Sequence, residues 1–138
     1  MSYRHLEHST DAIIEVTAPN LTRAFEVAGM SVVETILDPS KIDEKTNFSV
    51  LVKGKDLRYL LYNWLEEIII LTITDGFAAR KISVKIDKNR EYRIQAQVAG
   101  EEIDIKKHGF KVEIKSPTFH EMYIQEGEQI TLRYLLDL

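Results

Sequence analysis

The period of the hydrophobic pattern changes along the chain, and this change limits the fold more than any other sequence feature. Two segments in the first half repeat apolar residues at steps of three and four, the spacing of an amphipathic helix. From residue 81 onward apolar and polar residues alternate, as in strands that bury one face. The pattern predicts an α+β fold, with two helices packed on a largely antiparallel β-sheet.

The two expected helices each begin after a residue that caps free backbone N–H groups. Asn20 precedes the first, which ends near Asp38-Pro39, and Asp56 precedes the second. Their apolar faces are broad enough for burial in a core. These faces comprise Leu21, Ala24, Phe25, Ala28, Val32 and Ile36 in the first helix, and Leu57, Leu60, Leu61, Trp64, Leu65, Ile68 and Ile69 in the second.

Alternation predicts strands before, between and after these helices. The polar residues 87–90 predict a hairpin connection, and residues 126–128 a second turn. The chain shows no repeat and no linker, so residues 1–138 are expected to form one domain. The expected strands are 12–17, 46–53, 82–86, 92–98, 111–115, 119–125 and 130–136.

Composition excludes several classes of protein. Hydrophobic residues make up 44% of the 138 residues, enough for a core, and the absence of cysteine excludes thiol catalysis and Cys-ligated zinc. The net charge of −4 argues against naked nucleic acid as the main partner. Residues 1–7 lack a signal-peptide core, and no apolar run approaches the roughly 20 residues of a membrane span. We expect a cytoplasmic protein.

Positive charge is concentrated in residues 80–115, which carry ten Lys or Arg against six Asp or Glu. Two interpretations stay open. Basic side chains commonly cover the solvent face of exposed strands, and the same pattern also suits a shallow surface for RNA or for an acidic partner.

No catalytic signature is present. The chain has no Gly-rich phosphate loop, G-x-S-x-G, H-E-x-x-H or EF-hand loop. We therefore expect no enzyme activity, no catalytic residues and no bound organic cofactor. Two carboxylates nevertheless stand out, because Asp11 directly precedes an apolar strand and Asp137 directly follows one. Single acidic residues at strand ends more often form turns or caps, so position alone leaves their role open.

An ordered set of segments resembles the archease family across nearly the whole chain. Ser9-Thr10 and Ser116-Pro117 depart from the family pattern, but both departures keep the side-chain oxygens that matter. The matching segments are His8-Ser9-Thr10-Asp11, Ala24-Phe25-Glu26-Val27-Ala28, Trp64-Leu65-Glu66-Glu67, Ile105-Lys106-Lys107-His108, residues 112–122 and Leu136-Asp137-Leu138.

The resemblance implies an accessory protein. Archeases assist the RtcB-type RNA ligase of tRNA splicing by promoting guanylylation and multiple turnover, and some are linked to tRNA cytosine-5 methyltransferases in a chaperone-like role. The family is also associated with a calcium site, here implied at Asp11, Asp137 and Leu138. Calcium takes about 6–8 oxygen ligands, and Leu138 can add only a main-chain or terminal oxygen. Such a site requires the first and last expected strands to be adjacent.

The histidines give weaker hypotheses. A histidine beside an apolar strand is more often a hydrogen-bonded structural residue than a ligand, which applies to His108 and His120. His5, His8 and Asp11 are three apart, but a strand does not place all three on one face, so zinc ranks low.

Three functions remain open from the sequence. The first is a non-enzymatic activator of an RNA ligase. The second is a metal-dependent hydrolase that uses Asp11 and Asp137, although the sequence singles out no nucleophile or general base. The third is a chaperone-like module for a tRNA methyltransferase, for which the sequence pI of about 5.6 fits a basic protein partner.

Overall fold

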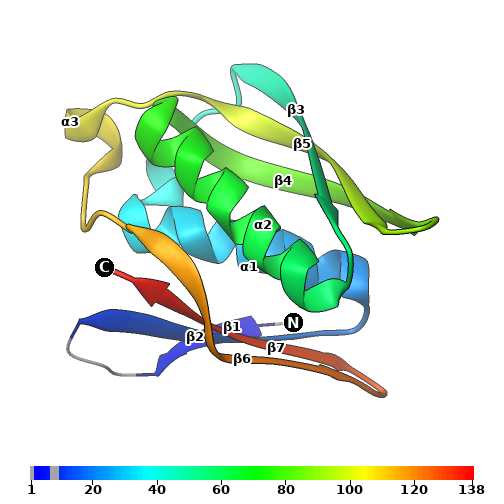
Figure 1. Ribbon diagram of the computed structural model, residues 1–138. Coiled ribbons are helices and arrows are strands. Elements are labelled where there is room, and N and C mark those ends of the chain that lie inside the picture. Colours follow the sequence, from blue (N-terminus) through cyan, green and yellow to red (C-terminus); the bar gives the residue numbers. More distant parts are fainter. Residues whose placement is uncertain (1, 7–9) are drawn as a thin grey trace.

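Two long helices lie between two antiparallel sheets in the computed structural model, which describes residues 2–6 and 10–138 (Figure 1). The strands are β1 (Ser2–Leu6), β2 (Asp11–Ala18), β3 (Thr46–Gly54), β4 (Phe77–Lys88), β5 (Tyr92–Glu102), β6 (Ser116–Glu126) and β7 (Ile130–Asp137). The helices are α1 (Leu21–Ile36), α2 (Leu57–Ile69) and the one-turn α3 (Ile105–His108), with a 3-10 turn η1 (Pro39–Lys41) and a π-helical extension η2 (Ile70–Thr74).

The first sheet, sheet A, has four strands in the order β1-β2-β7-β6, and the second, sheet B, has three in the order β3-β5-β4. All the pairs are antiparallel. Helix α1 packs on β4 of sheet B and on β2 of sheet A, while α2 packs on β3 and β6. The predicted α+β class is confirmed, with two sheets in place of the single sheet that alternation suggested.

Both predicted helix caps are present. The Asn20 side chain accepts a hydrogen bond from the Arg23 N–H at 2.8 Å, and that of Asp56 accepts one from the Tyr59 N–H at 2.9 Å. Each side-chain oxygen satisfies a backbone donor that the first helical turn leaves without a partner.

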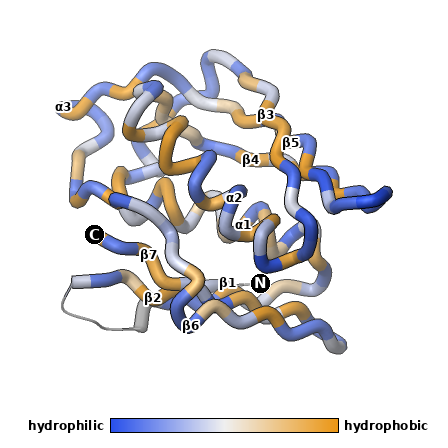
Figure 2. Tube along the Cα trace, viewed as in Figure 1, coloured by the Kyte–Doolittle hydropathy of each residue, from blue (hydrophilic) through white to orange (hydrophobic). Residues whose placement is uncertain are grey.

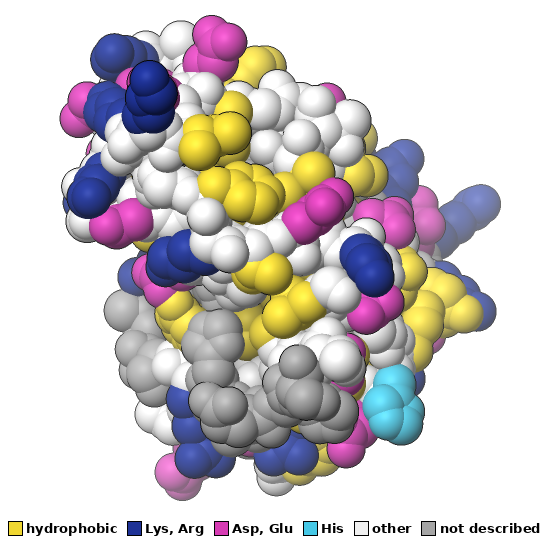
Figure 3. Space-filling model, turned by 90° about the vertical axis from the view of Figure 1, so that its left-hand side faces the viewer, with side chains coloured by type: hydrophobic (Ala, Val, Ile, Leu, Met, Phe, Trp, Pro, Cys, Tyr) yellow, Lys and Arg dark blue, Asp and Glu magenta, His cyan; other side chains and the backbone are white. Residues whose placement is uncertain are grey.

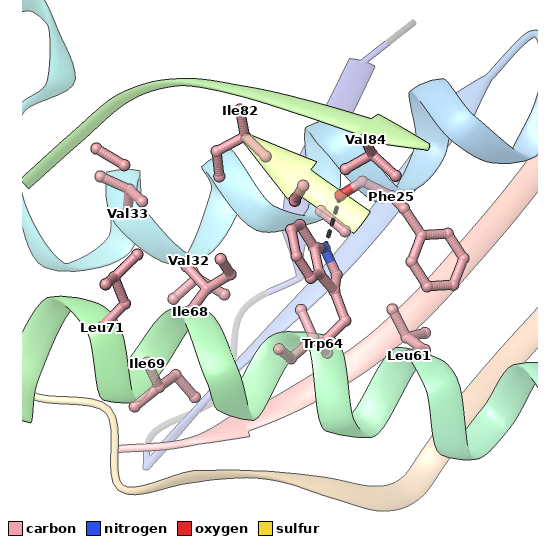
Figure 4. Packing of buried hydrophobic residues seen from close by; sticks show 14 of the residues in the cluster. Phe25, Val32, Val33, Leu61, Trp64, Ile68, Ile69, Leu71, Ile82 and Val84 are labelled. Atoms are coloured by element: carbon pink, nitrogen blue, oxygen red, sulfur yellow. Dashed lines mark hydrogen bonds between the residues drawn. The ribbon is translucent and has the colours of Figure 1, made fainter. Parts of the chain in front are cut away.

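Trp64 lies at the centre of the core between α1 and α2 (Figure 4). Its side chain is fully buried, and its indole Nε1–H donates to the carbonyl of Phe25 at 2.8 Å. Figure 2 shows hydrophobic residues along both long helices and along β2 and β7, whereas the tip of the β4–β5 hairpin is hydrophilic. The helices thus bury the inner face of each sheet.

One predicted strand is wrong, and two short elements of the structure were not predicted. The predicted strand at 111–115 is wrong, because this segment is irregular and Lys111 N–H donates to the carbonyl of Ile36 at the end of α1. Strand β1 and helix α3 were not predicted. Both are short, and neither repeats its apolar residues often enough to show a period. Among the described residues no helix is long and apolar enough to cross a membrane.

Candidate functional site

Asp11 and Asp137 face one another across two neighbouring strands. Asp11 begins β2, Asp137 ends β7, and the register of the pair places them directly opposite. Alternation puts Ala12 and Leu136 on the buried face, so both carboxylates belong to the outer face of sheet A. The adjacency that a shared site requires is therefore present. Directly opposite residues have Cβ atoms about 4.5–5.5 Å apart, a separation that two ligands of one cation can span.

Ser116 extends this row onto a third strand. It begins β6 and is registered opposite Asp137 from the other side. The three side chains Asp11, Asp137 and Ser116 therefore follow one another across β2, β7 and β6. A serine hydroxyl is a neutral oxygen ligand of the kind that calcium accepts beside carboxylates. From the sequence alone, Ser116 stands out only as a departure from the family pattern, because its place in the row depends on strand pairing.

Leu138 is held next to this row by its main chain and its side chain. Its N–H donates to the carbonyl of Thr10 at 3.3 Å, and the side chain packs against the core. The carbonyl of Asp137 accepts from the Lys115 N–H at 2.7 Å. Backbone hydrogen bonds to Thr10 and Lys115 thus fix the main chain around Asp137 on both sides. A fixed main chain limits the directions that the Asp137 carboxylate can take.

Further along the same sheet face, beyond the Ile13–Leu135 pair, lies an ion-pair cluster. Glu15 lies opposite Arg133 and contacts it at 2.9 Å, and it also contacts Arg4 at 3.1 Å. The hydrogen bond from Arg133 lowers the pKa of Glu15 below its ordinary value, and the Arg4 hydrogen bond adds to this effect. Glu15 therefore forms ion pairs with two arginines. The carboxylate pair at the end of the sheet is that of Asp11 and Asp137.

Helix α3 lies at the same end of the molecule as the end of β7 (Figure 1). It presents Ile105, which is 63% exposed, and is followed by Phe110, which is 46% exposed. Figure 3 views this end and shows hydrophobic side chains across its middle, with charged side chains around them. Exposed apolar surface rimmed by charge is typical of a protein-docking surface.

The Glu101 carboxylate anchors α3 to the end of β5. It is 7% exposed, and its Oε2 accepts hydrogen bonds from the Asp43 N–H at 2.8 Å, Lys107 Nζ at 2.8 Å and His108 Nε2 at 2.9 Å. These donors, with the Asp43 N–H foremost, hold the pKa of Glu101 far below its usual range. The α3 turn is therefore fixed in position.

His108 serves structure in this cluster. Its side chain is fully buried, and its Nδ1 accepts from the Asp104 N–H at 2.9 Å, so the proton of the neutral ring is on Nε2, which faces Glu101. The structural interpretation of His108 is thus supported. His120 is exposed on β6, where its N–H donates to Thr118 Oγ1 at 2.8 Å.

Other metal sites find no support in the described part of the chain. Among those residues no group of three or more His, Cys, Asp or Glu side chains is gathered for a metal ion. The Asp11 row has only two such side chains, and its other oxygens come from a hydroxyl group and the main chain. It is therefore not a group of this kind, and it remains the candidate site. His8, one member of the low-ranked zinc triad, lies outside the described residues.

Comparison with known proteins identifies the family. The sequence pattern of the Archease protein family matches residues 3–138. This chain belongs to the archease family. It is 35% identical over 125 residues to protein archease of Pyrococcus abyssi, which covers 90% of this chain and 88% of the relative. It is 34% identical over 139 residues to protein archease of Pyrobaculum neutrophilum, covering 99% and 95%.

Solved structures agree with this membership. The solution structure of Methanobacterium thermoautotrophicum protein 1598 matches the archease-family chain with a TM-score of 0.84 and 30% identity, covering 99% of this chain and 98% of the other. The crystal structure of an archease from Thermotoga maritima, described as a possible chaperone, matches with a TM-score of 0.61 and 17% identity, covering 98% and 96%. The second likeness shows the fold alone.

Proposed function

We propose that this archease-family chain is a non-catalytic accessory protein that activates an RtcB-type RNA ligase in tRNA splicing. In this role it promotes guanylylation and multiple turnover of the ligase and holds calcium, or another divalent cation, at Asp11 and Asp137. Family membership supports the accessory role. The observation that carries the proposal is the placement of Asp11 directly opposite Asp137.

The donor set fits a hard cation. Two carboxylates, the Ser116 hydroxyl and the main-chain oxygen of Leu138 supply oxygen ligands only, the type that calcium prefers. These donors are fewer than the about 6–8 that calcium takes, so a bound cation keeps positions open for water or a partner's oxygen. When bound, the cation supplies a positive charge that anionic groups of the partner can approach.

The surroundings of the row fit a protein partner. Ile105 and Phe110 provide exposed apolar area at the same end of the fold, on a turn that Glu101 holds rigid. A rigid apolar anchor at the same end of the molecule as a charged site lowers the entropic cost of docking. The ligase therefore contacts α3 and the Asp11 row together.

The test measures guanylylation of the purified cognate ligase with substoichiometric amounts of this protein. The intact protein should raise the rate and permit repeated turnover, while Asp137→Asn should lose most of the effect. Glu128→Gln, which removes an exposed carboxylate from the β6–β7 turn, is the matched control and should act like the intact protein. Equal ligase turnover with and without the intact protein would show that the activator assignment is wrong.

A further inference from the structure

Three of the four sheet edges are protected against pairing with another strand. Strand β1 is only five residues long. Strand β6 has an irregular register between Thr118 and Tyr123 and packs on α2, where Arg58 Nη1 donates to the Met122 carbonyl at 3.0 Å. Strand β4 is capped where its Val84 N–H donates to Glu26 Oε2 at 2.8 Å. Short length, bulges and capping are the means by which proteins prevent edge pairing.

Strand β3 has no such protection along most of its length. It is nine residues long, contains no proline, and pairs only with β5 among the described strands. Phe48 and Leu51 are 50% and 57% exposed, and Lys53 is its one charged residue. A long, exposed and apolar edge strand is a template for an added strand.

One contact shows which backbone N–H and C=O groups of β3 point away from β5. Asn63 of α2 donates through Nδ2 to the Lys53 carbonyl at 2.8 Å, so this carbonyl points away from β5. In an antiparallel pair alternate residues direct both backbone groups to the same side. The N–H and C=O groups of Leu51 and Ser49 therefore also point to the open side, beyond the reach of the Asn63 cap.

A groove of about 590 Å³ runs beside this edge, between β3 and the end of α2. Phe48, Leu71 and Phe77 line it, and the rings of Phe48 and Phe77 meet edge to face at 4.7 Å. Side chains on one face of an added strand would enter this groove, and those on the other face would lie beside Leu51.

The charge of the groove selects its occupant. Glu67, Asp75 and Glu102 line it, no Lys or Arg does, and none of the three carboxylates forms an ion pair within the described part of the chain. A second copy of this chain would bring the same three carboxylates to the contact, whereas a basic segment would meet opposite charge.

We propose that the open edge of β3 binds an extended segment of a partner protein that alternates apolar with basic residues and adds a fourth strand to sheet B. The surface is separate from the Asp11 row, and its occupant need not be the ligase. Backbone hydrogen bonds to Ser49 and Leu51 give affinity, and the acidic groove selects for lysine or arginine.

The test uses a blocked nonapeptide that alternates valine with lysine or threonine, titrated into the intact protein by calorimetry. Hydrogen exchange of the Ser49 and Leu51 amides should slow when it binds. Two altered peptides should each bind at least about tenfold more weakly. A peptide with glutamate in place of lysine loses the charge complementarity with the groove. A peptide N-methylated along a single edge loses the backbone hydrogen bonds to β3.

Variants locate the site on the protein. Glu67→Lys should weaken peptide binding about fivefold or more at low salt and less at high salt, while Glu66→Lys, the same change on the neighbouring exposed residue, should not. Leu51→Lys should weaken binding, and Tyr123→Lys, on the exposed part of β6, should not. Binding without slowed exchange at Ser49 and Leu51, or equal effects of the matched variants, overturns the proposal. Sedimentation showing a dimer that Leu51→Lys dissociates would overturn it in favour of a second copy.

Discussion

Asp11 at the start of β2 lies directly opposite Asp137 at the end of β7, on the outer face of sheet A. Like charges placed opposite one another across strands disfavour pairing, yet the register of β2 and β7 places these two carboxylates directly opposite each other. A cation bound between them would convert this repulsion into a contribution to stability, because a ligand that binds only the folded state shifts the folding equilibrium.

Replacing Asp11 with asparagine should abolish calcium binding and leave the fold intact. The change keeps the size of the side chain and removes one of two anionic ligands. Saturating calcium should raise the Tm of the intact protein and leave that of Asp11→Asn unchanged, as measured by thermal unfolding with and without calcium. Glu128→Gln serves as the control and should keep the calcium effect. An unaltered calcium affinity in folded Asp11→Asn would contradict the assigned ligand.

Ser116→Ala should weaken calcium binding by a smaller factor, about two- to fivefold, because it removes one neutral oxygen from a site dominated by two carboxylates. The alanine fits the strand, so thermal unfolding without calcium should change little. Calorimetric titration of calcium gives the affinities. Ser49→Ala, on an exposed strand of sheet B, is a matched control that should bind as the intact protein does. If both variants bind equally well, Ser116 is only a neighbour of the site.

The sequence predicts the long helices well because their signals are local. Asn20 and Asp56 cap the helices they were expected to cap, and the apolar face of α2, including Trp64, is buried as its spacing predicts. Each of these features depends on residues within one or two turns of one another.

The parts that were missed depend on contacts distant in sequence. Val112 and Ile114 alternate with polar residues as a strand would. However, Lys111 bonds to the end of α1, and the segment contacts a strand only at its last residue, where the Lys115 N–H donates to the Asp137 carbonyl. The place of Ser116 beside Asp137 follows from pairing that no local pattern encodes. Only the resemblance to archeases brought Asp11 and Asp137 together before the structure did.

Trp64→Phe should destabilise the protein by about 2–3 kcal/mol. The change removes the hydrogen bond to the Phe25 carbonyl and leaves a cavity where the larger indole ring packed. Urea unfolding should show a lower midpoint with an unchanged slope. Tyr59→Phe, which alters an exposed aromatic residue of the same helix, should have almost no effect. If the urea midpoint of Trp64→Phe equals that of the control, the indole ring and its hydrogen bond do not stabilise the packing of α1 on α2.

Glu101→Gln should make the protein less stable at pH 7 and remove part of its sensitivity to acid. The Asp43 N–H, Lys107 and His108 hold the pKa of Glu101 far below its value in the unfolded chain, about 4.3, and Lys45 Nζ adds a contact at 3.4 Å. The folded state therefore binds fewer protons, and the stability that Glu101 supplies is fully present above pH 4.3 and declines as the pH falls below it.

The measurement is the free energy of unfolding in urea at pH 7 and at pH 3 for the intact protein and the Gln variant. The difference between them should be largest at pH 7 and smaller at pH 3, since protonation of the unfolded carboxyl then competes with the native contacts. Glu102→Gln, which changes the exposed neighbour, should follow the intact protein at both values. A difference that stays constant between pH 7 and pH 3 would mean that the carboxylate charge does not hold α3 in place, and that the shape of the side chain suffices.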